Sequence, residues 1–205
     1  MIENYQSQVD KIIRIGDLII SNSTYKKSIN NYAIISLGGT PSRKHDEYWN
    51  GNIKWINSGA ITGTPAILKE TELITELGVK NSATKPAYTG DTVLSIIEPL
   101  KSKVSLILDD NIYFNQSVIC ISSIDKRNIG LVYFASRKLI DEIKGYATGA
   151  AQQSINKDIV NNSEIYIPTE IEIKKLNLLC KNILSMEKQI RKLKEIKLKL
   201  LEKYF

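Results

Sequence analysis

The side chains best suited to chemistry are cations and small polar groups in and after one turn-rich segment, residues 37–61. Arg43 and Lys44 end a Gly-Gly-Thr-Pro-Ser turn, where loop cations can contact phosphate oxygens. Amides and hydroxyls follow the next predicted strand, and such groups can hydrogen-bond to base edges. Each can also be an ordinary surface side chain. The candidate nucleic-acid contacts are Arg43, Lys44, Lys54, Asn57, Ser58, Thr62, Thr64, Lys80, Lys85, Lys101 and Lys103.

Catalytic chemistry finds little support in the sequence. The single histidine, His45, lies in a polar turn, which argues against histidine-based acid–base catalysis, Ser-His-Asp triads and His-rich metal sites. Asp109-Asp110 is the only acidic pair in the central region, and it resembles a turn between strands more than a nuclease site. A methyltransferase would need a glycine-rich cofactor loop and an Asn/Asp-Pro-Pro-aromatic motif, and neither is present. We therefore expect no enzymatic activity, cofactor or metal.

The positive charge of the chain is concentrated near its C-terminus. The net charge of +6 and the pI of about 9.1 favour an acidic partner, and nucleic acid is the commonest. Residues 170–205 hold ten Lys/Arg and five Asp/Glu, so this segment carries +5 and the rest of the chain only +1. Two interpretations of the basic segment stay open: direct contact with DNA, or a solvated helix face.

Turn signals alternate with β-branched runs from residue 30 to residue 165, which predicts an α+β domain with a twisted sheet. Pro41 fixes the turn after Gly38-Gly39, and Asn50-Gly51 is a strong hairpin signal. Tyr48, Trp49 and Trp55 are expected as core or loop anchors more than as stacking platforms for bases. Strands are expected at 32–35, 53–56, 92–97, 104–108, 118–121 and 130–133, and helices at 70–77 and 136–144.

Both ends of the chain have helical patterns. Residues 1–29 predict a short amphipathic arm that ends near Gly16 and the polar residues 21–24. We therefore divide the chain into a domain at 1–165, which includes this arm, and a long helix at 166–205. In the long helix eight of nine heptad a/d positions are apolar, which is typical of a coiled coil. The predicted dimer interface is Leu176, Leu179, Ile183, Met186, Ile190, Leu193, Leu200 and Tyr204, with Lys197 as the polar exception.

A second helix must cover most of this seam, because a single domain can cover only one end of a helix about 43 Å long. A helix from a partner is the expected cover. The alternative is that the helix folds back onto its own domain, for example against residues 2–13.

Other features favour a cytoplasmic protein. Cys120 and Cys180 lie in no C-x-x-C motif, so reduced thiols are more plausible than a disulfide. The N-terminus lacks the basic and apolar regions of a secretion signal, and no apolar run is long enough to cross a membrane.

Several motifs occur in an order that resembles a known family. Residues 37–61 read LGGTPSRKHDEYWNGNIKWINSGAI, and they are followed by YTGDTVLSII at 88–97 and YFNQSVICI at 113–121. A Gln-bearing segment at 147–168 ends in Ile-x-Ile-Pro before the Lys-rich helix. This order resembles specificity subunits of type I restriction–modification systems over residues 30–205. The chain departs from the pattern at His45-Asp46, Lys54 and Ala60, and in the shortened 168–172 segment.

The resemblance implies one DNA target recognition domain followed by a long coiled-coil helix, which is half of a full-length specificity subunit. It also implies double-stranded DNA, a methyltransferase subunit and, with that, a restriction subunit as partners. A homodimer of such halves would read a bipartite inverted site. The alternative is a non-enzymatic module that pairs with a full-length specificity or methyltransferase subunit and modulates target choice.

Overall fold

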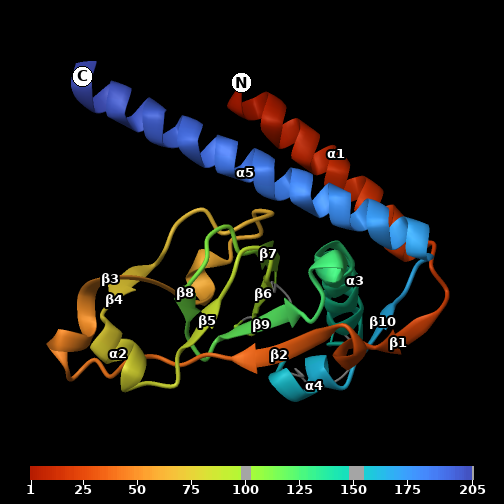
Figure 1. Cartoon of the computed structure of the whole chain (residues 1–205), viewed down its shortest axis with the longest axis horizontal. Helices are drawn as coiled ribbons and strands as arrows, with labels where there is room; N and C mark the ends of the chain where they lie inside the picture. The colour runs from red at the N-terminus through yellow and green to blue at the C-terminus, as the bar shows by residue number, and fades with distance from the viewer. Residues whose placement is uncertain (98–102, 148–154, 205) are drawn as a thin grey trace.

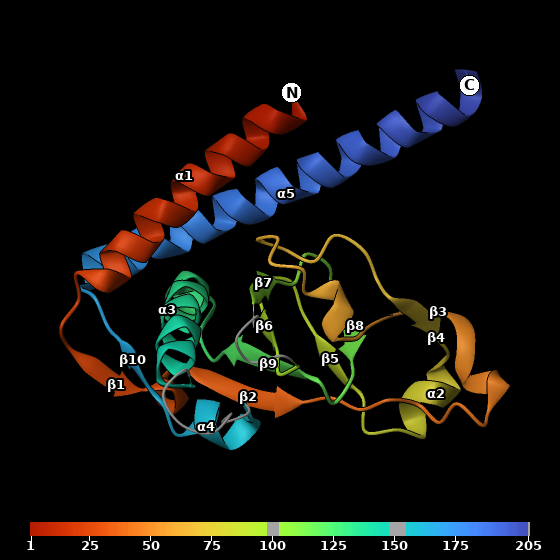
Figure 2. The ribbon, with the colours of Figure 1, turned by 180° about the vertical axis from the view of Figure 1, so that it is seen from behind.

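The computed structural model describes residues 1–97, 103–147 and 155–204. Lys101, one of the candidate contacts, lies outside these residues. Two long helices, α1 (Ile2–Ser21) and α5 (Glu170–Tyr204), lie side by side and antiparallel above an α+β domain (Figures 1 and 2). At 1.5 Å per residue α1 is about 30 Å long and α5 about 52 Å. The C-terminal part of α5 therefore extends beyond the N-terminus of α1.

The domain contains two four-stranded sheets and one pair of strands. The first sheet has the order β2-β9-β6-β7 and is antiparallel throughout. The second has the order β4-β3-β8-β5 and includes one parallel pair, β3 with β8. The strands are β1 (Lys26–Ser28), β2 (Ala33–Leu37), β3 (Trp49–Ile56), β4 (Glu72–Ile74), β5 (Lys85–Ala87), β6 (Thr92–Ser95), β7 (Val104–Leu106), β8 (Ile112–Phe114), β9 (Val118–Ser123) and β10 (Glu164–Tyr166).

The pair β1–β10 joins the segment that leaves α1 to the segment that enters α5. This pairing holds the C-terminal end of α1 beside the N-terminal end of α5, as Figure 1 shows. The short helical elements are η1 (Ile29–Asn31), η2 (Asp46–Tyr48), η3 (Ser58–Ala60), α2 (Glu76–Lys80), η5 (Lys126–Asn128) and α4 (Lys157–Asn161).

The largest core lies between the first sheet, α3 (Ile129–Ala147) and the two long helices. Tyr133 and Phe134 of α3 are fully buried there. A second cluster lies between the sheets, and a third surrounds Trp49, Trp55 and Ile74. The expectation that both tryptophans are core anchors is confirmed, because both are buried.

Two predicted elements are wrong, and the N-terminal helix ends at the expected polar run 21–24 but not at Gly16. Residues 130–133 belong to α3, not to a strand: Leu131–Phe134 are buried on every side, so the run lacks the polar face that identifies a surface helix. The helix expected at 70–77 is replaced by β4 and α2, because the Thr75 hydroxyl accepts the Gly78 N–H and starts the helix there. Gly16 lies inside α1, where a Cβ would overlap the Phe134 ring.

The buried stripe of α5 is covered from within the chain. Leu176, Ile183 and Ile190 of the predicted dimer interface are buried, and Leu179 and Met186 pack against the same core. The alternative of a helix that folds back therefore describes the first part of α5. Past Ile190 the apolar residues are partly or fully exposed, and they include Leu193, Ile196, Leu200, Leu201 and Tyr204.

Candidate nucleic-acid interface

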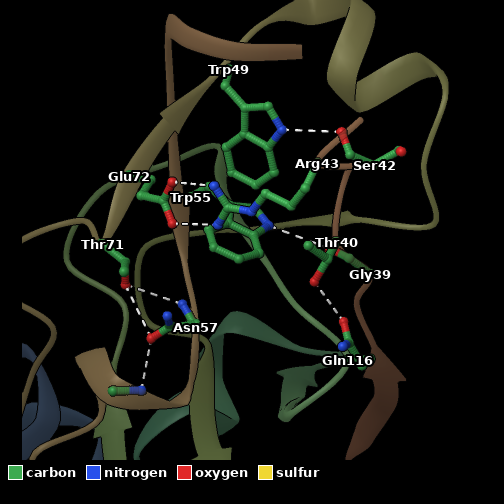
Figure 3. Close-up of polar contacts among 11 residues, drawn as sticks. Gly39, Thr40, Ser42, Arg43, Trp49, Trp55, Asn57, Thr71, Glu72 and Gln116 are labelled. Carbon is green, nitrogen blue, oxygen red and sulfur yellow. Dashed lines mark hydrogen bonds and ion pairs between the residues drawn. The ribbon is translucent and has the colours of Figure 1, made fainter. Parts of the chain in front are cut away.

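The Gly-Gly-Thr-Pro-Ser-Arg loop is held against the second sheet by backbone groups and indole nitrogens. The Gly39 N–H donates to the Phe114 carbonyl at 3.0 Å, and a Cβ at Gly38 would overlap that same oxygen. Trp55 Nε1 donates to the Gly39 carbonyl at 3.3 Å, and Trp49 Nε1 donates to the Ser42 carbonyl at 3.2 Å (Figure 3). The two glycines are thus required by close packing, and the tryptophans fix the path of the loop.

Arg43 links the end of this loop to β4. Its two Nη atoms donate to the Glu72 carboxylate at 2.7 and 2.6 Å, and its guanidinium lies 3.5 Å from the centre of the Trp49 ring (Figure 3). The Arg43 hydrogen bonds lower the pKa of Glu72 more than partial burial raises it. Both side chains stay partly exposed. Arg43 therefore anchors the loop, and a DNA phosphate would compete with Glu72 for its donors.

Residues 57–71, which follow β3, form a loop that we call the polar rim. The Asn57 side-chain oxygen accepts the Gly59 N–H at 2.8 Å and caps η3, and the Thr71 hydroxyl accepts the Asn57 N–H at 3.1 Å. Asn57, Thr62 and Thr64 line one depression of about 490 Å³ together with Lys69. The structure thus brings together three of the candidate polar contacts. Ser58 lies beside them as the first residue of η3.

Lys103 closes the same rim from the side of β7. Its Nζ donates to the Thr62 carbonyl at 2.6 Å, and the neighbouring Ser105 hydroxyl donates to the Thr64 carbonyl at 2.7 Å. The polar rim is therefore held in place by hydrogen bonds within the loop and by hydrogen bonds from Lys103 and Ser105. Pre-ordering such a loop lowers the entropy lost on binding a ligand.

Lys54 takes part in an ion network that reaches the long helix. Its Nζ donates to Asp109 Oδ2 at 2.8 Å, and Arg191 of α5 donates to both oxygens of Asp109 at 2.7 and 2.8 Å. Hydrogen bonds from Arg191, then from Lys54, hold the pKa of Asp109 far below its usual range against the opposing effect of burial. The acidic turn expected at 109–110 thus supplies the carboxylate that pairs the domain with α5.

The remaining candidate cations lie away from the polar rim. Lys44 and Lys80 are exposed near η2 and α2, two elements that pack on each other, and Lys85 is exposed on β5. Sequence reasoning missed a second group, the basic side chains of Lys69, Lys188, Arg191, Lys192 and Lys194, which line one groove between the polar rim and α5. The +5 charge of the C-terminal segment was the available signal.

No group of three or more potential metal-ligating side chains occurs among the described residues. In the same part of the chain, no helix is both long and apolar enough to span a bilayer.

The family model "Type I restriction modification DNA specificity domain" matches residues 12–198. The chain belongs to this family. Specificity domains of type I systems recognise DNA and are not catalytic, so the expectation of a non-enzymatic DNA-binding protein is confirmed at the level of the family. No curated protein matches the sequence.

Solved structures of type I systems share the fold of this specificity domain. The S subunit from M. genitalium matches with a TM-score of 0.57 and 11% identity, over 100% of this chain and 57% of that one. The HsdS subunit from Thermoanaerobacter tengcongensis matches with a TM-score of 0.52 and 13% identity, over 94% and 50%. A structure described as the basis of complex assembly and conformational transition of the type I R-M system gives 0.52 and 15%, over 98% and 55%. The chain spans about half the length of each.

Proposed function

We propose that this chain acts as a half-length specificity subunit: two copies pair through the distal parts of α5, and each copy reads one half of a bipartite, inverted DNA site. Two identical domains related by a two-fold axis present the same contacts to two half-sites, so protein symmetry is mirrored in the DNA. Methylation and cleavage would then be performed by methyltransferase and restriction subunits recruited to the dimer.

The observation that carries the proposal is the apolar overhang of α5. Leu200 is 52% exposed and Tyr204 66% exposed. Together with Leu193, Ile196, Leu201 and the polar exception Lys197, they line one largely apolar hollow on the distal part of α5. A stripe of large apolar side chains on a single helix in water favours pairing with another helix. The same hollow on a second copy offers a self-complementary surface.

For the DNA contacts we keep the full candidate set, which includes Lys101 outside the described residues, and the polar rim is its most compact part. Asn57, Ser58, Thr62 and Thr64 offer donors and acceptors for base edges, and Lys54 and Lys103 lie beside them. Arg43, Lys44, Lys80 and Lys85 would contact the phosphate backbone further along the domain. We also propose that the recognition domain comprises residues 1–165 and the long helical segment residues 166–205.

Methylome sequencing of a host that expresses the chain with its methyltransferase tests the proposal. We expect a motif of two inverted half-sites separated by unread bases. A continuous or asymmetric motif would contradict the homodimer.

A second candidate function is favoured by the weak charge of the domain. Outside residues 170–205 the net charge is only +1, and Arg43 and Lys54 are already paired with carboxylates. Such a domain could act as a module that modulates the target choice of a full-length specificity or methyltransferase subunit. Titration of labelled DNA distinguishes the two functions, because sequence-selective, salt-dependent binding by the chain alone excludes the module.

A further inference from the structure

The groove between α5 and the polar rim is rich in cations, and the proposed function uses only Lys54 among them. It has a volume of about 820 Å³ and is lined by six cations and two carboxylates. The cations come from both walls: Lys54 and Lys69 from the domain, and Lys188, Arg191, Lys192 and Lys194 from α5. In Figures 1 and 2 the loop between β3 and β4 rises toward the middle of α5.

Four of these cations are not neutralised by a direct contact. Lys54 and Arg191 are neutralised by Asp109, but Lys69, Lys188, Lys192 and Lys194 form no hydrogen bond or ion pair with another described residue. All four are exposed. Unpaired cations on two facing walls create a field that attracts a polyanion and can replace its counterions.

The basic side chains of α5 are also ordered along the helix. At about 100° per residue, six of its ten cations fall within about 60° of one another. These are Lys174, Lys181, Lys188, Lys192, Lys199 and Lys203. The stripe passes the groove at Lys188 and Lys192 and continues onto the overhang, whereas the apolar residues Leu193 and Leu200 lie on another face. Helix pairing and polyanion binding therefore use different faces of α5.

We propose that this groove binds the phosphate backbone of the DNA next to the half-site read by the polar rim, so that α5 is a DNA-contacting element as well as a spacer. The inference rests on the proposed function. It assigns Lys69, Lys188 and Lys192 to phosphate contacts, which set affinity and register but carry no base specificity. The groove is continuous with the depression that holds Asn57, Thr62 and Thr64, because Leu68, Lys69 and Glu70 line both.

The test uses the full-length protein and two duplexes of equal length, one with the motif read from the methylome and one of mixed sequence. Each phosphate contact adds about 0.9 to the slope of log K against log salt. Lys188→Gln/Lys192→Gln should therefore make the slope shallower by about 1.8, and it should weaken binding to both duplexes by the same factor. Lys69→Gln, on the domain wall, should lower the slope by about 0.9.

The matched control is Lys11→Gln/Lys175→Gln, which removes two exposed cations from α1 and from α5 outside the basic stripe. It should leave the slope unchanged. Unaltered slopes in all groove variants, with selective binding by the parent protein intact, would overturn the groove proposal alone. Loss of methyltransferase binding with unchanged DNA binding would also overturn it, since the groove would then be a protein contact. Failure of the parent protein to bind the motif selectively would instead overturn the proposed function.

Discussion

Arg191 and Asp109, 82 residues apart in the chain, form a two-point ion pair that fastens the long helix to the recognition domain. Both side chains are about three-quarters buried, and Lys54 adds a third hydrogen bond to the same carboxylate. Arg191 directly follows Ile190, the last buried residue of α5 among the described residues, so the pair holds the helix to the domain just before its exposed part begins.

Replacement of Asp109 should weaken the attachment of α5 to the domain. Asp109→Asn removes the charge that two cations share, and we expect a loss of about 1–2 kcal/mol of unfolding free energy at pH 7. Trypsin should also cut faster between Lys188 and Lys203. Because the pKa of Asp109 is lowered in the folded state, its contribution is present above the unfolded value of about 3.9 and is lost as the pH falls through the lowered one. The Asn variant should thus approach the parent stability in strong acid.

Asp110→Asn is the control for that prediction. Asp110 accepts the Thr89 N–H at 2.9 Å, an interaction that an Asn oxygen can keep, and it forms no ion pair with Arg191. Equal losses in both variants would show that the turn, and not the ion pair, determines the stability.

The contribution of Glu187 to stability should depend on pH in the opposite direction to that of Asp109. It is 4% exposed on the buried stripe of α5, and burial raises its pKa, with Lys194 opposing and Asp10 of α1 adding to the shift. Its contribution is therefore full below the unfolded pKa of about 4.3 and is lost as the pH rises through the raised value. Glu187→Gln should stabilise the chain at pH 7 by about 0.5–2 kcal/mol and have little effect at pH 4. Thermal unfolding at both pH values checks this, and destabilisation at pH 7 would show that the carboxylate is favourably bound.

The dimer interface can be separated from the fold by two Asp substitutions. Leu200 is exposed in the single chain, so Leu200→Asp should leave thermal unfolding of the domain unchanged. A carboxylate at the interface between two chains would be unpaired and desolvated, so this variant should be a monomer by light scattering. Ile190 is 1% exposed within its own chain, so Ile190→Asp should cost several kcal/mol and destabilise the monomer itself. A dimer that survives Leu200→Asp would show that the chains pair elsewhere.

Arg43 combines an anchor with a predicted phosphate contact, and two substitutions distinguish them. Arg43→Lys keeps the charge but cannot form the two-point pair with Glu72, so it should cost up to about 1 kcal/mol and leave the salt slope unchanged. Arg43→Gln should also reduce the salt slope by about 0.9. If the slope stays at the parent value in Arg43→Gln, Arg43 serves only to anchor the loop.

Local signals predicted much of the domain. Five of the expected strands occur, because β-branched runs between turn residues have few alternatives to a sheet. The glycines before Arg43 and the anchoring role of the tryptophans also followed from residue type. Gly130–Tyr133 failed because a fully buried helix has no polar face, and short apolar runs then look alike.

The heptad pattern gave the helix but not the side that is buried. Cys180 and Glu187 are buried, whereas the predicted d positions Leu179 and Met186 are only partly so. The domain and α1 together cover a stripe that is rotated from the ideal seam, and no sequence period encodes that rotation. Arg191 and Asp109 could not be paired from sequence either, since they meet only through the tertiary fold.

The measurement that tests the central claim most directly is the mass of the protein–DNA complex in solution. A duplex with both half-sites of the methylome motif should hold two chains, and a duplex with one half-site scrambled should bind much more weakly. Two chains bound with equal affinity to a duplex of scrambled sequence, or one chain bound to the intact site, would contradict a homodimer that reads an inverted bipartite site.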